Sequence, residues 1–201
     1  MQGKEDMDTL LAESFKQIAK REPIEKITIK EITDGAGVIR PTFYNHFQDK
    51  YELLEWIVNK DLMEPAQLLF DNGFWSESVI LILKNIYKDK EFYTNAGKLD
   101  GQNSFEEICN KAICRGISSF IAGSRDSSSN VWLHRDKLAL FYANALTFQI
   151  LSWIRRRLSS VWTSRRSVSS FRWRYLEIPA ASSKISRRSV LFTARISSIR
   201  P

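Results

Sequence analysis

The sequence predicts an all-α protein in which a small N-terminal three-helix head precedes a larger helical body. Three observations predict this fold class. Apolar residues recur at helical spacing in several segments, glycine and proline separate those segments, and no alternating pattern of useful strand length interrupts them. A chain of 201 residues with 43% hydrophobic content can bury one sizeable core, or a small head packed on a larger body.

The first expected helix lies near the N-terminus and ends near Pro23. Leu11, Phe15 and Ile18 recur in it at i, i+4 and i+7, which is typical of an amphipathic helix. We expect this helix to pack across the two short helices that follow it.

The second expected helix begins at Thr28, because a threonine followed three residues later by Glu31 forms the sequence pattern of a capping box. Ile29, Ile32 and Ala36 then place one apolar stripe against a core. Gly35 and Gly37 predict a sharp turn after this helix, since glycine adopts left-handed backbone conformations at little steric cost.

The third expected helix begins near Arg40 or Pro41, since proline fits the first turn of a helix. Phe43 and Phe47 stand four residues apart and should anchor the helix in the core. The opposite face carries Pro41, Tyr44, Asn45 and Gln48. One flank, at i, i+4 and i+8, carries the donors Thr42, His46 and Lys50, which suit phosphate oxygens. Two short helices around a glycine turn are typical of a helix-turn-helix, which places its second helix in a major groove of DNA.

From about Leu10 to Ile57, the sequence resembles the DNA-binding domain of TetR/AcrR-family transcriptional regulators. The family pattern is matched by Gly37, Val38, Thr42, Phe43, Tyr44, His46, Phe47 and Lys50. The resemblance implies that Arg40, Pro41, Tyr44 and Asn45 face base edges. It implies that Thr42, Tyr44, His46 and Lys50 contact phosphates, with Thr28 and Lys30 near the DNA backbone. Alternatively, Pro41 only starts the helix and His46 only packs.

The resemblance also implies a homodimer, formed through C-terminal helices, that binds a pseudo-palindromic operator in double-stranded DNA. The wording VIRPTFYNHFQDKYELLEWI further resembles one subgroup, the activators of dihydroxyacetone kinase operons. A co-activator protein that resembles a dihydroxyacetone kinase subunit would then bring the signal. The alternative is a ligand-released repressor of a neighbouring operon, with a small-molecule effector.

Beyond the head, Asp49 is expected to cap a helix that runs through about Met63, with Pro65 beyond its end. Further helices are expected at roughly 77–88, 91–96, 104–121 and 131–154. The last is apolar almost all round, which favours burial against a second copy of the same helix. The alternative is a core helix within one chain. Candidates to line an effector pocket are Trp75, Phe92, Tyr93, Phe120, Phe141, Tyr142 and Phe148; alternatively, they are plain core.

Three regions follow: residues 1–50 as the helix-turn-helix domain, 51–154 as a helical effector and dimerisation domain, and 155–201 as an atypical tail. The tail carries twelve Lys or Arg and one acid, Glu177, whereas the rest of the chain has more acidic than basic residues. We hypothesise that a shifted reading frame produced it. The alternative is a genuine basic arm, which would support RNA or membrane-surface binding.

Several classes of function are not expected. The sequence has no glycine-rich phosphate loop, nucleophile elbow or metal-binding helix motif, so we expect neither an enzyme nor a cofactor or metal site. Cys109 and Cys114 lie about 140° apart around a helix and should stay as free thiols. No apolar run is long enough to span a membrane, and the N-terminus has acidic residues where a signal peptide would be basic, so we expect a cytoplasmic protein.

Overall fold

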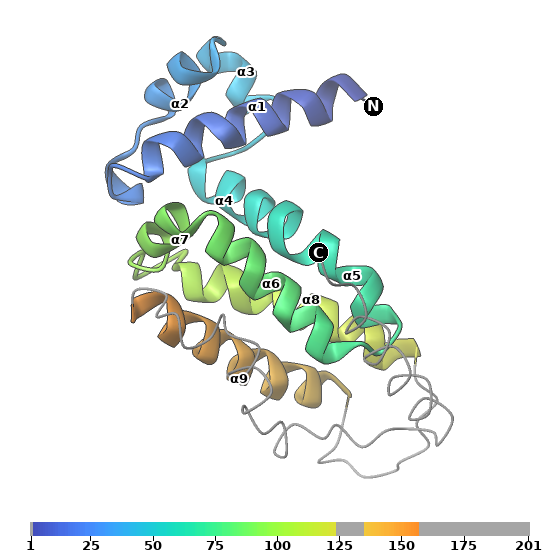
Figure 1. Cartoon of the computed structure of the whole chain (residues 1–201). Coiled ribbons are helices and arrows are strands. Elements are labelled where there is room, and N and C mark those ends of the chain that lie inside the picture. Colours follow the sequence, from blue (N-terminus) through green and yellow to red (C-terminus); the bar gives the residue numbers. More distant parts are fainter. Residues whose placement is uncertain (1, 124–134, 157–201) are drawn as a thin grey trace, which may run out of the picture.

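The computed structural model describes residues 2–123 and 135–156, and every regular element among them is a helix. Figure 1 shows α1 to α3 as a head at one end, α4 leading away from it, and α5 to α9 as a body. In chain order the elements are α1 (Gln2–Ala19), η1 (Ile24–Lys26), α2 (Ile29–Ala36), α3 (Arg40–Tyr44), α4 (Lys50–Val58), η2 (Asn59–Met63), α5 (Glu64–Asp71), α6 (Trp75–Lys88), α7 (Lys90–Ala96), α8 (Phe105–Gly123) and α9 (Arg135–Arg155). The predicted all-α fold class is confirmed. Residues 157–201 of the predicted tail lie outside the described residues.

The head is built around α1, which packs against α2 and α4. Leu11 and Phe15 of α1 are fully buried, as are Ile32 of α2 and Phe43 of α3. The predicted apolar stripe of the first helix therefore faces the core of the head. This packing fixes the direction in which α3 presents its outer face.

The turn between α2 and α3 depends on Gly37 alone, so the prediction that Gly35 also breaks the helix is wrong. Gly35 lies inside α2, whereas Gly37 has a positive φ of 70° and ends the helix. At Gly35 a Cβ atom would clash with Oγ of Ser14, which donates a 2.7 Å hydrogen bond to the carbonyl oxygen of Ile32. Gly35 thus permits the close approach of α1 and α2.

The helix that leaves the head runs further than the sequence predicted. Asp49 caps α4 as expected, since its Oδ1 accepts hydrogen bonds from the amides of Tyr51 and Glu52 at 2.8 Å. The predicted end near Met63 is wrong, because the π-helix η2 leads directly into α5. Pro65 lies in the first turn of α5. A proline there clashes with an ordinary α-helical turn before it, and the wider turn of η2 accommodates the ring.

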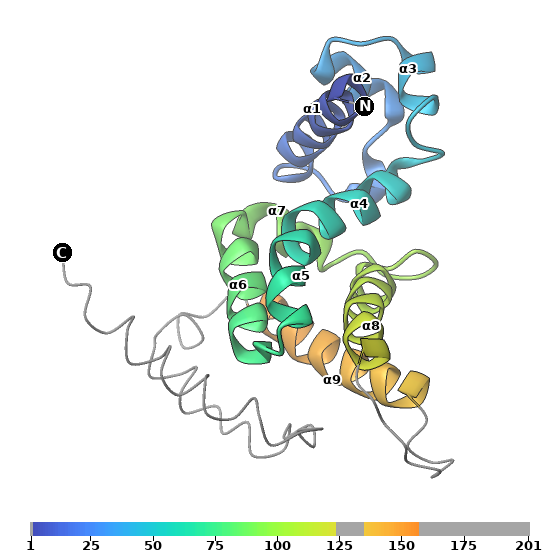
Figure 2. The same ribbon diagram turned by 90° about the vertical axis from the view of Figure 1, so that its right-hand side faces the viewer.

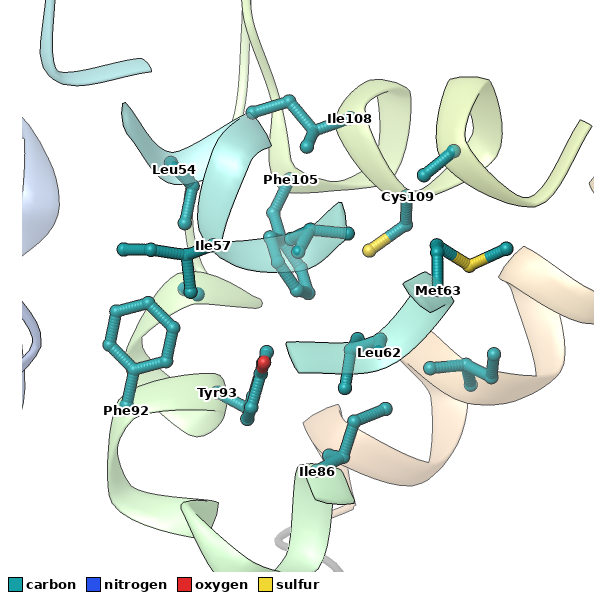
Figure 3. Packing of buried hydrophobic residues seen from close by; sticks show 14 of the residues in the cluster. Leu54, Ile57, Leu62, Met63, Ile86, Phe92, Tyr93, Phe105, Ile108 and Cys109 are labelled. Carbon is teal, nitrogen blue, oxygen red and sulfur yellow. The ribbon is translucent and has the colours of Figure 1, made fainter. Parts of the chain in front are cut away.

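The core of the body forms where α4, η2, α6, α7 and α8 meet. Figure 3 shows this core from close by, with side chains from all five elements. The labelled residues are Leu54, Ile57, Leu62, Met63, Ile86, Phe92, Tyr93, Phe105, Ile108 and Cys109. As predicted, Cys109 and Cys114 are free thiols, and burial raises the pKa of the Cys109 thiol well above its ordinary value.

The α8 and α9 helices pack along each other, and α9 lies at the side of the body far from the head (Figure 2). One side of α9 is buried, through Ala139, Ala143, Ile150, Leu151, Trp153 and Ile154. The other side exposes Leu140, Phe141 and Phe148. Throughout residues 2–123 and 135–156, no helix combines the length and the apolar character needed to cross a membrane.

Candidate nucleic-acid interface

The third helix of the head is short and firmly anchored. Pro41 lies in its first turn, as the sequence predicted. Phe43 is fully buried and Phe47 is 4% exposed, so both predicted anchors are confirmed. Helical hydrogen bonds continue just past α3, since the amide of Phe47 donates to the carbonyl oxygen of Phe43 at 2.9 Å. The side opposite these anchors faces solvent.

The exposed face of α3 carries a coupled arginine and tyrosine. Arg40, Pro41, Tyr44 and Asn45 are all exposed. Nη2 of Arg40 donates a 3.1 Å hydrogen bond to Oη of Tyr44, and its guanidinium carbon lies 5.7 Å from the centre of the Tyr44 ring. Stacking and hydrogen bonding together limit the freedom of a long side chain, so Arg40 is held in place before any partner arrives.

The start of α2 is capped as the sequence predicted. The backbone amide and the hydroxyl of Thr28 both donate to the Glu31 carboxylate at 2.7 Å, and the Glu31 amide donates to Oγ1 of Thr28 at 3.2 Å. Hydrogen bonds from Thr28 lower the pKa of the Glu31 carboxyl. Lys30, in the same turn, is exposed. The predicted DNA-backbone contacts of Thr28 and Lys30 stay predictions.

His46 is tied to the first helix. Its Nδ1 lies 2.6 Å from Oδ1 of Asp8, and the two side chains are only 14% and 11% exposed. This contact joins the chain after α3 to α1 across 38 residues of sequence, which no local pattern could have indicated. Nε2 is the remaining ring nitrogen, and a phosphate contact by His46 stays a prediction.

Lys50 holds the short helix η1 against the start of α4. Its Nζ donates to the carbonyl oxygens of Glu25 and Ile27, both at 2.7 Å. Burial lowers the pKa of the Lys50 ammonium, against the opposing charges of Glu25, Asp49 and Glu31. Two of its three N–H groups are thus used inside the head, and the predicted phosphate contact can use only the third.

Thr42 and Ile39 complete the surface around α3. Thr42 is half-buried, and its amide donates to the carbonyl oxygen of Ile39 at 2.9 Å. Ile39 is 70% exposed, although an apolar residue beside a glycine turn suggests a core position. Ile39 is not among the site residues that the sequence predicts.

A cavity of about 390 Å³ lies in the body between η2, α5 and α8. Residues from all three elements contribute both polar and apolar surface to its lining. The lining residues are Asn59, Met63, Glu64, Gln67, Asp71, Ala112, Arg115, Gly116 and Ser119. Arg115 is held at one side of it by a 2.9 Å ion pair with Glu55 and a 3.3 Å hydrogen bond to Asn59.

The aromatic residues predicted to line an effector pocket are not gathered around this cavity. Phe92 and Tyr93 are fully buried in the core, where aromatic rings bury the most area. Trp75 packs edge-on against Phe70, with ring centres 5.2 Å apart. Of the other four candidates, Phe141 and Phe148 are exposed, Tyr142 is half-buried, and the side chain of Phe120 lies outside the described residues.

A short helix that follows a glycine turn, buries two phenylalanines and exposes an arginine and a tyrosine defines a helix-turn-helix DNA-binding protein. Comparison with known families agrees with this class. Residues 10–57 match the family described as bacterial regulatory proteins, tetR family, and residues 74–160 match a family described as a transcriptional regulator C-terminal region. The chain belongs to the TetR family of DNA-binding transcriptional regulators.

One similar protein is the HTH-type dhaKLM operon transcriptional activator DhaS of Lactococcus lactis subsp. lactis (strain IL1403). It is 31% identical over 94 residues, which are 45% of this chain and 49% of that protein. The chain thus spans about half the length of this relative.

Two solved structures are similar to the chain. One is described as the dihydroxyacetone kinase operon activator DhaS, with a TM-score of 0.56 and 21% identity over 97% of this chain and 98% of that one. The other is NalD of Pseudomonas aeruginosa, described as the secondary repressor of the MexAB-OprM multidrug efflux pump. Its TM-score is 0.48, with 14% identity over 78% of this chain and 88% of that one. The similarity to the DhaS structure supports the all-helical fold.

Proposed function

We propose that the chain regulates transcription by binding a pseudo-palindromic operator as a homodimer, with α3 in the major groove. The observation that carries this proposal is the two-sided character of α3. Phe43 and Phe47 are buried, whereas Arg40 and Tyr44 are exposed and joined by a hydrogen bond. An arginine fork fits O6 and N7 of guanine, the most common specific contact in the major groove.

The predicted site residues of the head keep the roles that the family resemblance implies. We assign the base edges to Arg40, Pro41, Tyr44 and Asn45. We assign the phosphates to Thr28, Lys30, Thr42, Tyr44, His46 and Lys50. Of these, His46 would use Nε2 and Lys50 its third N–H group, because their other polar atoms are engaged within the head. Phosphate contacts position the head, and base contacts supply the sequence preference.

The proposed homodimer uses α9 of both chains. Phe141 and Phe148 are 65% and 64% exposed and lie seven residues apart, so they share one face of α9 with Leu140 beside them. Two copies of an apolar helix face bury each other in a two-fold dimer. Two recognition helices then reach successive major grooves about 34 Å apart, which requires an inverted repeat in the operator. In this account residues 51–154 receive the signal and form the dimer, and residues 1–50 bind DNA.

Two kinds of signal have support. Similarity to a protein named as an operon activator favours activation of dihydroxyacetone kinase genes, with a co-activator protein that resembles a kinase subunit. The cavity beside η2 favours the alternative, a small-molecule effector that releases a repressor of a neighbouring operon. A reporter gene placed downstream of the bound operator distinguishes the two kinds of signal. The chain should raise reporter expression if it is an activator and lower it if it is a repressor.

The test of the proposal is selection of duplexes by the full chain from a random-sequence pool. We expect enrichment of an inverted repeat with half-site centres about one helical turn apart, 10 to 10.5 base pairs or a multiple of it. Enrichment of a single direct site would contradict the dimer. The proposed function as a whole is wrong if no common sequence is enriched.

A further inference from the structure

Ile39 contributes little to the stability of the fold. It is the residue that precedes α3, and it makes no side-chain hydrogen bond to the start of the helix. Serine, threonine, aspartate and asparagine are favoured at such positions because their oxygens accept the free amides of the first turn. The isoleucine forgoes this stabilisation and leaves 70% of its surface in solvent.

The two apolar residues that precede α3 lie in different surroundings. Val38 is partly buried and packs against the hydrophobic core. Ile39, in an extended conformation with φ and ψ of −84° and 151°, leaves 70% of its surface in solvent. It therefore lies at the edge of the same exposed surface as Arg40 and Tyr44.

We propose that Ile39 contacts the C5-methyl group of a thymine in each half of the operator. This inference rests on the proposed function. The major-groove edges of base pairs are lined with hydrogen-bond donors and acceptors, and the thymine methyl is their one apolar group. A branched apolar side chain that enters the groove beside Arg40 gains contact area only against that methyl. Ile39 thus makes the chain prefer a thymine close to the base that Arg40 contacts.

The experiment uses the duplex selected by the full chain, with each thymine replaced in turn by deoxyuridine. Deoxyuridine lacks the methyl group and keeps every hydrogen-bonding group of thymine. At one thymine in each half-site, the replacement should weaken binding about fourfold, the equivalent of one buried methyl group. Any loss at another thymine, for example one that Pro41 contacts, should be the same in a variant that lacks the Ile39 side chain.

The variant Ile39→Ser assigns the effect to this side chain. It should bind the thymine and deoxyuridine duplexes equally, and it should melt no lower than the parent because serine can cap α3. Leu68→Ser is a matched control, since Leu68 is 73% exposed but lies on α5 in the body. This control should keep the fourfold difference.

Two results would overturn the inference. One is a parent chain that binds every deoxyuridine duplex as tightly as the thymine duplex. The other is an Ile39→Ser variant that retains the fourfold difference or loses affinity equally for both duplexes. Failure to select any duplex would refute the proposed function instead, so the two failures are distinguishable.

Discussion

Nζ of Lys16 in α1 lies 2.7 Å from Oδ2 of Asp61 in η2, and the same nitrogen lies 2.8 Å from Oδ2 of Asp89. Asp61 is also held by the body, because Nδ2 of Asn85 donates to its carbonyl oxygen at 2.8 Å. The head is thus joined to the π-helix by charge. Asn59 and Met63 of η2 line the cavity, so this short segment borders the cavity and is also joined to α1 through Asp61.

Replacement of Lys16 by methionine should lower the free energy of unfolding by about 2 kcal/mol, because it leaves two partly buried carboxylates without their shared cation. Denaturant unfolding followed by circular dichroism measures this loss. Lys60→Met is the control, since the pairs of Lys60 with Glu5 and Glu64 are more exposed and its removal should leave stability close to that of the parent. Equal losses in the two variants would show that the link is no stronger than a surface pair.

The same link predicts a dependence of stability on pH. Burial alone would lower the pKa of Lys16, but hydrogen bonds and charges of Asp61 and Asp89 outweigh it and raise that pKa above 10.5. Burial alone would raise the pKa of Asp89, but Lys16 and Lys20 outweigh it and lower that pKa below 3.8. A raised lysine pKa stabilises the fold below pH 10.5 and loses its effect as the pH rises through the folded-state value. A lowered aspartate pKa stabilises above pH 3.8 and loses its effect as the pH falls through the folded-state value.

The stability difference between the parent and Lys16→Met should therefore be constant between about pH 5 and pH 9 and shrink on both sides of that range. Denaturation midpoints of both proteins, measured across the range, test this. A difference that grows toward acid pH would contradict the assigned directions.

The contact between Gly35 and Ser14 predicts a non-additive pair of substitutions. Gly35→Ala alone should lower stability by about 1 kcal/mol, because the new methyl group forces the Ser14 hydroxyl away from the carbonyl oxygen of Ile32. In a Ser14→Ala background it should raise stability by roughly 0.5–1 kcal/mol, since alanine favours the helix. A double-mutant cycle by chemical denaturation gives the coupling, and additive effects would mean that the two helices separate freely.

Short-range signals in the sequence predicted much of the head. The Thr28 and Glu31 capping box, the Asp49 cap, Pro41 in a first turn and the buried Phe43 all appear as expected. Each depends on residues within one helical turn of one another. Local chemistry alone therefore determines where these helices begin and which side of α3 is buried.

Such local patterns could not predict contacts between segments that lie far apart in the sequence. The bond of His46 with Asp8 joins residues 38 apart, and that of Lys16 with Asp61 joins residues 45 apart. Both depend on how α1 lies across the rest of the chain. Pro65 was misleading for a related reason, because a proline ends an ordinary helix but fits after the wider turn of η2. Aromatic composition alone could not place Phe92 and Tyr93, which lie fully buried in the core of the body.

If the exposed face of α9 forms the proposed dimer, charge placed there should separate the two chains. The double variant Phe141→Glu and Phe148→Glu should sediment as a monomer and lose cooperative binding to an inverted repeat, because two apolar faces can no longer bury each other. Leu68→Glu, which alters an exposed leucine on α5, should sediment as the parent does. A double variant that remains a dimer would show that the chain associates through another surface.

The most direct test of the central claim, that the exposed face of α3 reads DNA, compares two exposed tyrosines. Tyr44 on α3 is 49% exposed and Tyr87 on α6 is 40% exposed, so replacement of either by alanine should leave the fold intact. Affinity for the selected duplex is measured by titration at one fixed salt concentration. Tyr44→Ala should bind at least about tenfold more weakly than the parent, whereas Tyr87→Ala should bind as the parent does. Equal affinity of Tyr44→Ala and the parent would contradict a role of the exposed face of α3 in DNA binding.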